Sequence, residues 1–260
     1  MGMDIKKIKI NAWNGSDPNN TLKYANHELS KYPEKVEYVG PYLNWEGITL
    51  FVDLCFDPEH IHIIDKVNSK YKVAWFHEPR GLNNLQPKRL NTLETIIDKF
   101  DFIMTYDEYL LDKYPDKCKF CIDNGIWVSD HMIKLHEKTK LASMIYSWKN
   151  WSPGHKIRHQ VANLVQGLDL YGSGPNNPIN FKEEGLKDYY FSITIENSKS
   201  KNYFTEKILD CFACGTIPIY WGCPNIGDYF DARGIIMFDS IKDLENIFKK
   251  MGDINYINSF

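Results

Sequence analysis

The sequence predicts an α/β fold in which two Rossmann-like halves face each other across a cleft. Short runs rich in β-branched and aromatic residues alternate with amphipathic stretches, which is typical of parallel α/β architecture. This alternation begins twice, and a chain of 260 residues can form two domains of ordinary size. A polar, irregular segment (124–140) separates the two series, so we place an N-terminal domain at residues 1–138 and a C-terminal domain at residues 139–260.

The first series consists of short apolar runs, which predict strands, and two stretches with apolar residues at helical spacing. The predicted strands are 7–13, 35–40, 47–54, 72–78, 100–106 and 119–123, and the predicted helices are 58–69 and 89–100.

The second series follows the same logic and ends in an amphipathic helix. Its predicted strands are 140–147, 168–172, 189–196, 216–222 and 234–239, and its predicted helices are 154–167, 203–215 and 241–251. In the helix over 203–215, Ile208, Leu209 and Phe212 can pack on a sheet, and Gly215 is a natural C-cap.

Composition excludes several classes of protein. The formal net charge is −3, so a broad basic face for nucleic acid is not expected, and an anionic ligand must be bound by a few local cations. The first thirty residues contain no apolar stretch of signal-peptide length, and no window approaches the roughly 18 apolar residues of a membrane span. We therefore expect a soluble, cytoplasmic protein.

Two CxxC pairs, Cys118/Cys121 and Cys211/Cys214, raise the question of a zinc site. Zinc-binding pairs usually lie in short turns, whereas Cys211 and Cys214 fall within an apolar helical pattern. Reduced, partly buried thiols are the better interpretation, and we expect no metal.

A cluster of polar residues lies between a predicted buried strand and the helix that follows it. The strand over 189–196 ends in Glu196 and Asn197, and Tyr203, Glu206 and Lys207 come at the start of the helix. In an open parallel sheet, ligands bind beyond the carboxyl ends of the strands, where helix N-termini favour phosphate. Local sequence also allows a structural alternative, in which Lys207 pairs with Glu206 or Asp210 on a solvated face.

Neighbouring glycines do not point to other nucleotide-binding motifs. The chain has no Walker-type glycine loop, and "YGSGP" at 171–175 is too short for a dinucleotide fingerprint. A tight turn is the simpler role for that segment.

The stretch "ENSKSKNYFTEKILDCFACGTIPIYWGCPNI" (196–226) resembles the donor-binding signature of the α-1,3/1,4-fucosyltransferases, glycosyltransferase family 10. Members carry an E-N-S/T segment, then Y-V-T-E-K, a helix, P-I/V-Y-W/Y-G and a P-N/S-I/V turn. Phe204 replaces the usual valine and Asn202 the frequent aspartate or glycine.

The resemblance implies a GT-B fold, meaning two Rossmann-like domains, and an inverting transfer of fucose from GDP-fucose to a hydroxyl group of a glycan. It implies no cofactor and no required metal, and the absence of a DxD triplet in this sequence agrees. By matching position, Asn197, Tyr203, Glu206 and Lys207 bind the donor, with Glu196 in the same segment. Lys207 would neutralise the pyrophosphate.

Two further roles follow from the resemblance upstream of this stretch. Arg158 is the best candidate for an arginine that reaches the pyrophosphate, with Lys156 and Lys149 as rivals, because a guanidinium can bind two phosphate oxygens at once. In the first half, "VAWFHEPRGL" places Glu78 where the family has its general base. His77 beside it is an alternative, since its ordinary pKa suits base catalysis at neutral pH.

Several alternatives remain open at this level. Another nucleotide sugar could be the donor, or the chain could bind a nucleotide sugar without turning it over. The chain is shorter than animal members with a membrane stem, which indicates a compact bacterial or viral enzyme. The acceptor could be a lipid-linked glycan, in which case the enzyme would contact a membrane peripherally.

Overall fold

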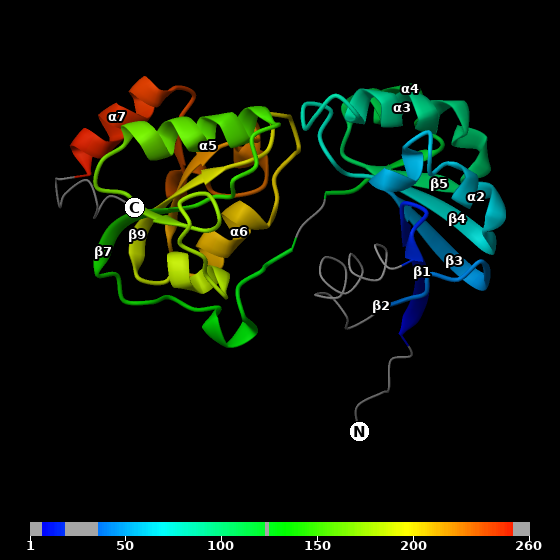
Figure 1. Ribbon diagram of the computed structural model, residues 1–260, viewed down its shortest axis with the longest axis horizontal. Helices are drawn as coiled ribbons and strands as arrows, with labels where there is room; N and C mark the ends of the chain where they lie inside the picture. Colours follow the sequence, from blue (N-terminus) through cyan, green and yellow to red (C-terminus); the bar gives the residue numbers. More distant parts are fainter. Residues whose placement is uncertain (1–6, 19–35, 123–124, 252–260) are drawn as a thin grey trace. The chain divides into compact units, whose positions relative to one another are not determined.

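The structure, a computed structural model, describes residues 7–18, 36–122 and 125–251, and its contacts divide the chain into two compact units, Met1–Ile122 and Asp123–Phe260. Both units contain a parallel β-sheet with helices packed on it (Figure 1). Two Rossmann-like α/β units are therefore present, as the alternation of elements predicts.

The sheet of the first unit has six described strands in the order β2-β1-β3-β4-β5-β6, and every pair is parallel. The strands are β1 (Ile8–Asn14), β2 (Val36–Val39), β3 (Asn44–Val52), β4 (Asn68–Phe76), β5 (Phe102–Thr105) and β6 (Cys118–Phe120). The helical segments are η2 (Asp53–Phe56), α2 (His62–Lys66), α3 (Gln86–Thr95), η3 (Ile97–Lys99) and α4 (Glu108–Lys113).

Alternation along the strands gives this sheet two apolar faces. In β3, Phe51 packs in a large cluster with Leu93 of α3, whereas Leu50 and Val52 belong to a second cluster that includes Trp75 of β4. Both faces of the central strands are therefore buried, as expected for a parallel sheet.

The sheet of the second unit has five described strands in the order β11-β10-β9-β7-β8, again all parallel. The strands are β7 (Lys140–Ile145), β8 (Asp169–Tyr171), β9 (Tyr189–Ile195), β10 (Ile217–Trp221) and β11 (Ile236–Met237). The α-helices are α5 (Pro153–Leu164), α6 (Glu206–Ala213) and α7 (Ile241–Lys250), and short 3-10 turns are η4 (Asp130–Met132), η5 (Lys182–Gly185), η6 (Ile226–Asp228) and η7 (Ala232–Gly234).

Strand β9 is the centre of this unit, and its two faces are chemically different. Phe191 and Ile193 pack in the cluster that includes Leu244 of α7. On the other face, the Thr194 hydroxyl lies 3.2 Å from the Cys211 sulfur of α6. Helices α5 and α7 thus cover one face of the sheet, and α6 covers the other (Figure 1).

Most predicted elements are present, with differences at helix starts. Helix α4 was not expected; its N-cap Asp107 accepts a hydrogen bond from the Leu110 N–H, but the helix has only six residues, too few for a clear periodic pattern. The helix expected from residue 203 begins at Glu206, because Asn202 has a positive φ of 62° and Thr205 is extended. Residues 35, 123 and 124, at the edges of predicted segments, lie outside the described residues.

The division between the units comes earlier in the chain than the predicted boundary at 138/139. The segment expected to be a linker is attached to the second unit: the N–H groups of Trp127 and Val128 donate to Asp210 of α6 at 2.6 and 3.2 Å. Lys138 Nζ donates to the carbonyls of Lys187 and Cys214. Backbone amides and the Lys138 side chain therefore attach this segment to the second unit, and a hydropathy pattern does not reveal such contacts.

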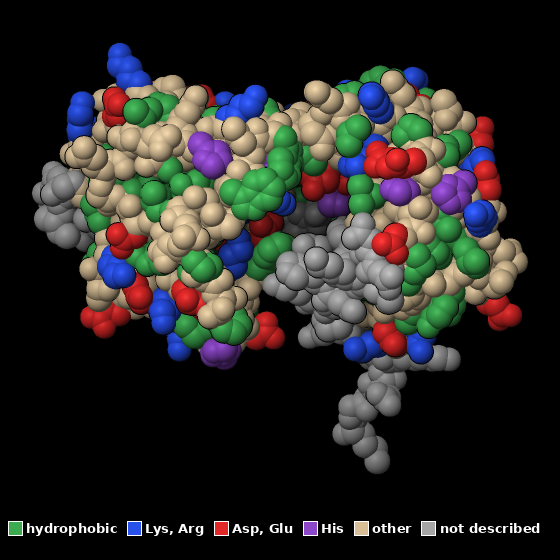
Figure 2. Space-filling view, in the orientation of Figure 1, with side chains coloured by type: hydrophobic (Ala, Val, Ile, Leu, Met, Phe, Trp, Pro, Cys, Tyr) green, Lys and Arg blue, Asp and Glu red, His purple; other side chains and the backbone are tan. Residues whose placement is uncertain are grey.

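The distribution of charged side chains and the state of the cysteines are as the sequence predicts: no broad basic face is seen among the described side chains in Figure 2, and the thiols are reduced. On the face that Figure 2 shows, described acidic and basic side chains are interspersed over both units. All six cysteines are free, and all except Cys121 are buried. Among the described residues, no helix is long and apolar enough to cross a bilayer.

A matched pair of leucines tests the packing of the second unit. Leu244 of α7 is fully buried, whereas Leu164 of α5 is 58% exposed. We expect Leu244→Ala to lower the free energy of unfolding by about 2–5 kcal/mol, because it removes buried methyl groups and leaves a cavity. Leu164→Ala should change it by less than about 0.5 kcal/mol. Urea unfolding followed by circular dichroism measures both, and equal losses would contradict the assigned packing.

Candidate functional site

Glu196 anchors the polar cluster in the second unit. It follows β9, is 0% exposed, and its two carboxylate oxygens accept hydrogen bonds from the backbone N–H (2.9 Å) and the hydroxyl (2.7 Å) of Thr205. Thr205 is the N-cap of α6, yet its own side chain makes no cap hydrogen bond. The end of β9 therefore holds the start of α6 through a buried carboxylate, and Glu196 offers no exposed atom to a ligand.

Lys207 lies in the first turn of α6, between two acids. Its Nζ donates to the Thr205 hydroxyl at 2.8 Å and lies 3.3 Å from Glu196 Oε2 and 3.4 Å from Glu206 Oε1. Burial by itself would lower the pKa of Lys207, but the nearby Glu196 and Glu206 together have the larger effect, so the pKa of Lys207 is raised. The side chain is 23% exposed, so Lys207 occupies a partly buried position and not the solvated face of the structural alternative.

Glu206 is the second acid beside this ammonium group. Burial works against its charge, but Lys207 and Lys182 lower the pKa of Glu206 to about 2. Lys182 precedes β9 in the chain and was not singled out from the sequence. Glu206 is therefore an ionised acceptor at neutral pH.

Arg158 reaches the same strand end from α5. It is 6% exposed, and its Nε and Nη2 donate to the Ile195 carbonyl at 3.1 and 2.5 Å. Nη2 also lies 3.1 Å from Asn197 Oδ1. Burial lowers the pKa of Arg158, but a guanidinium stays charged in proteins. Its rivals Lys149 and Lys156 are exposed.

The close approach of α5 to residues 196 and 197 requires a glycine. The Gly154 N–H donates to the Asn197 carbonyl at 3.0 Å, and a Cβ at Gly154 would lie 1.7 Å from the Glu196 carbonyl oxygen. A capping box between Ser152 and His155 starts the helix. Burial and the nearby Arg158 lower the pKa of His155 to about 4, so this ring is neutral at pH 7.

Tyr203 lies in the loop that connects β9 to α6 and is 3% exposed. The loop is held by Asn225, which accepts from the Asn202 N–H at 2.9 Å and donates to the Asn202 Oδ1 at 2.8 Å. Tyr229 donates to the same oxygen at 2.7 Å. Asn202, a departure from the family pattern, thus keeps a conformation with positive φ through its own side chain.

A pocket opens beside these groups, with Arg158 and Lys207 among its lining residues. It contains about 380 Å³ of empty space, open solvent included, and Lys182 and Asp210 also line it. Burial raises the pKa of Asp210 to about 6, and among the described residues its Oδ2 has no hydrogen-bond partner. From the sequence, Asp210 was considered only as a possible ion-pair partner of Lys207, and the pocket was not predicted.

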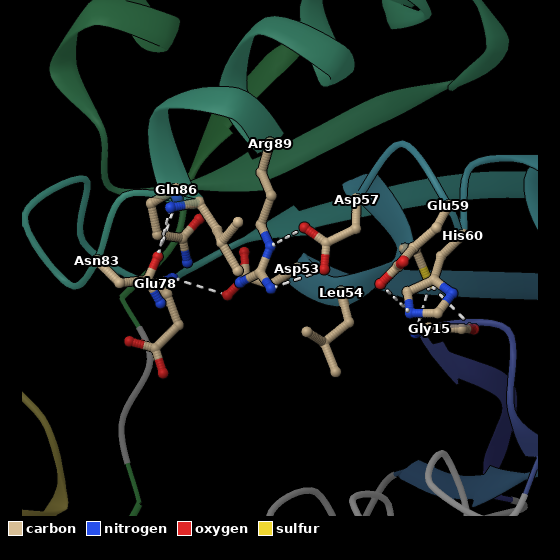
Figure 3. Close-up of polar contacts among 12 residues, drawn as sticks. Gly15, Asp53, Leu54, Asp57, Glu59, His60, Glu78, Asn83, Gln86 and Arg89 are labelled. Carbon is tan, nitrogen blue, oxygen red and sulfur yellow. Dashed lines mark hydrogen bonds and ion pairs between the residues drawn. The ribbon is translucent and has the colours of Figure 1, made fainter. Parts of the chain in front are cut away.

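Glu78 and His77 lie in the first unit, directly after β4. The Glu78 side chain is half-buried and points away from Asp53 and Arg89 (Figure 3). The His77 ring is turned toward Asp53, with Nε2 3.3 Å from Oδ2, and its side chain is 12% exposed. Asp53 and Arg89 were not singled out from the sequence; Asp53 lies within the predicted strand 47–54, whereas in the structure β3 ends one residue before it.

Of the predicted site residues, the structure brings six together in the second unit: Arg158, Glu196, Asn197, Tyr203, Glu206 and Lys207. All of them lie at the carboxyl end of β9, in the loop that follows it, or on the helices α5 and α6. This is the position where open parallel sheets bind ligands.

Comparison with known proteins gives a match to this region and a similarity in fold. Residues 135–256 match the family model described as "Glycosyltransferase family 10 (fucosyltransferase) C-term". An α-(1,3)-fucosyltransferase of Helicobacter pylori is 28% identical over 151 residues, which cover 57% of this chain and 29% of that protein. A GDP-fucose protein O-fucosyltransferase 3 of Xenopus laevis is 24% identical over 211 residues, which cover 70% of this chain and 43% of that protein. The chain thus spans less than half the length of these two relatives.

A solved structure of an α1,3-fucosyltransferase is similar with a TM-score of 0.61 and 17% identity, over 99% of this chain and 80% of that one. At this level of identity the similarity concerns the fold. The predicted fold class, GT-B with two Rossmann-like domains, is confirmed.

The charge pair at the start of α6 predicts a dependence of stability on pH. The pKa of Glu206 is about 2 in the folded protein, against an ordinary value of 4.5. The ionised Glu206 therefore stabilises the folded state fully above pH 4.5, and this stabilisation disappears as the pH falls toward 2. Glu206→Gln should therefore flatten the loss of stability over that pH range, measured by thermal unfolding. Glu245→Gln on the exposed side of α7 controls for the loss of one negative charge, and an unchanged slope in Glu206→Gln would contradict the pairing.

Proposed function

Since residues 135–256 match the model of glycosyltransferase family 10, we propose that the chain is an inverting fucosyltransferase that moves fucose from GDP-fucose to a hydroxyl group of a glycan. The observation that carries the proposal is the pair of cations, Arg158 and Lys207, at the carboxyl end of β9 beside the start of α6. An ammonium group on a partly exposed side chain, a guanidinium and a helix N-terminus together suit a pyrophosphate.

In this proposal the donor-binding residues have different tasks. Lys207 and Arg158 bind the pyrophosphate, while Asn197 and the ionised Glu206 hydrogen-bond hydroxyl groups of the ribose or the sugar. Tyr203 lines the donor site from the loop before α6. Glu196, which is fully buried, contributes by holding Thr205 and Lys207 in place.

The chemical step is a single displacement at the anomeric carbon. Glu78 takes the proton from the acceptor hydroxyl as its oxygen attacks, and GDP leaves with additional negative charge. Because that charge develops in the transition state, Arg158 and Lys207 can lower the barrier as well as bind the donor. A metal ion is not needed for this stabilisation. Among the described residues, one group of metal-ligand type, Asp57, Glu59 and His60, lies close together, but Arg89 already binds Asp57.

The orientation of His77 favours Glu78 as the base. The His77 ring faces the buried Asp53, whereas Glu78 points away from it. A base must reach the proton that it removes, so the direction of the side chain decides between Glu78 and His77 before their ordinary pKa values do.

The names of the two relatives differ: one is an α-(1,3)-fucosyltransferase, a name that gives a linkage, and the other a protein O-fucosyltransferase, a name that gives a protein acceptor. We propose a glycan acceptor, soluble or linked to a membrane lipid. The higher identity to the α-(1,3)-fucosyltransferase supports this choice.

A panel of nucleotide sugars tests the donor. With GDP-fucose, GDP-mannose, UDP-glucose and UDP-galactose, we expect slow release of nucleotide from GDP-fucose alone, and transfer when a glycan such as N-acetyllactosamine is added. Lys207→Ala should slow release on the order of a hundredfold and weaken GDP binding. Lys156→Ala, at an exposed position of α5, is the matched control. Release from another donor would reassign the sugar, and binding without release would indicate an inactive binding protein.

The choice of base is tested by two substitutions at neighbouring positions. Glu78→Gln should lower kcat for transfer by about 10²–10⁴-fold, the usual contribution of a general base. Its affinity for GDP should stay unchanged, because the proposed donor residues belong to the other unit. His77→Gln should cause a much smaller loss. Single-turnover transfer from labelled GDP-fucose measures both rates, and a larger loss in His77→Gln would move the role of base to His77.

A further inference from the structure

A buried carboxylate lies behind Glu78, and the proposed reaction does not use it. Asp53 follows β3, and Glu78 comes two residues after β4 ends. These strands are neighbours, with Val52 in register with Trp75. Both chain segments therefore leave the sheet at the same edge.

Asp53 binds the backbone of both residues after β4. Its Oδ2 accepts from the Glu78 N–H at 3.0 Å (Figure 3). Its Oδ1 accepts from the His77 N–H at 3.2 Å. Its side chain is 5% exposed. A buried carboxylate that accepts from two successive amides fixes the path of the chain between them.

Charged groups on neighbouring elements support this carboxylate. Burial raises the pKa of Asp53, whereas His77 and Arg89 of α3 favour its charged form. Arg89 is itself held by Asp57, with Nε–Oδ1 at 2.7 Å and Nη2–Oδ2 at 2.9 Å.

The remaining titratable groups near Asp53 are Cys55 of η2 and Tyr106 after β5. Burial raises the pKa of both, to about 12 for the Cys55 thiol, so both are neutral at pH 7. The charged groups around Asp53 thus include Asp57, Arg89, Glu78 itself and, when protonated, His77, and Asp107 and Arg80 act on Tyr106.

We propose that Asp53 is the positioning residue for Glu78: by holding the amides of residues 77 and 78 it sets the direction in which the Glu78 side chain leaves the sheet. This inference rests on the proposed function, in which Glu78 is the base. It also accounts for the orientation of the His77 ring, which the same carboxylate turns toward itself.

To bind both amides, the side chain at position 53 needs a hydrogen-bond acceptor at each of its two terminal atoms, as a carboxylate has. In Asp53→Asn, an NH₂ group replaces one oxygen and faces an N–H donor, so one of the two amides loses its partner. The backbone at residues 77 and 78 then shifts, and a displacement of about 1 Å can cost up to about a hundredfold in rate.

A double-mutant cycle tests the proposal. Asp53→Asn, Glu78→Gln and the double variant are compared by single-turnover transfer from GDP-fucose to N-acetyllactosamine, with GDP affinity measured in parallel. We expect Asp53→Asn to lower kcat roughly ten- to a hundredfold with GDP affinity unchanged. In the Glu78→Gln background the same substitution should have no further effect, because the group that it positions is absent. Asp65→Asn, at the exposed pair with Lys99, is the matched control.

The outcomes distinguish a failure of Glu78 as the base from a failure of Asp53 as its positioning residue. If Glu78→Gln leaves transfer unchanged, the proposed role of the base fails. If Glu78→Gln lowers kcat as expected but Asp53→Asn leaves kcat unchanged, or lowers it equally in both backgrounds, the positioning role is overturned. Should Asp53→Asn fail to fold, Asp57→Asn tests the same network one contact further out, by releasing Arg89. It should lower kcat by a smaller factor that again disappears in the Glu78→Gln background, and persistence of that factor would overturn the proposal.

Discussion

The site in the second unit depends on one buried carboxylate, that of Glu196. A fully buried acid is unfavourable unless hydrogen bonds and an opposite charge compensate for the lost hydration, and here Thr205 and Lys207 provide both. Three consequences follow from this contact. Helix α6 begins at Glu206 and no earlier, Lys207 stays in a helical turn where the helix dipole disfavours it, and the ammonium group remains beside the end of β9.

The two units use the same physical device. In each, an acid directly after a central strand is buried and binds backbone groups of a neighbouring segment: Glu196 holds the start of α6, and Asp53 holds residues 77 and 78. In each, a basic residue stands close by, Lys207 in one and Arg89 in the other. Parallel strands end at a common edge, so a short acidic side chain there can reach the next connection without a long loop.

Much of the fold could be predicted from the sequence, because parallel strands buried on both faces are continuous apolar runs, such as 189–196, and amphipathic helices have their own period. The donor cluster could also be located, since its residues lie within twelve positions of one another. Contacts between distant segments could not. Nothing local in the sequence shows that Asp53 meets the amides 24 and 25 positions later, or that Asp210 binds Trp127 and Val128.

The attachment of residues 125–138 to the second unit determines where this protein can be divided. A polypeptide that starts at residue 139 would lack the two amides that donate to one oxygen of Asp210, which lines the same pocket as Arg158 and Lys207. Because these two hydrogen bonds favour the charged form of Asp210, their loss would change the ionisation of a carboxyl group in the lining of that pocket. The segment that looks like a connection between units therefore holds a residue of the pocket lining from outside the pocket, and any natural shuffling or engineered exchange of the second unit has to include it.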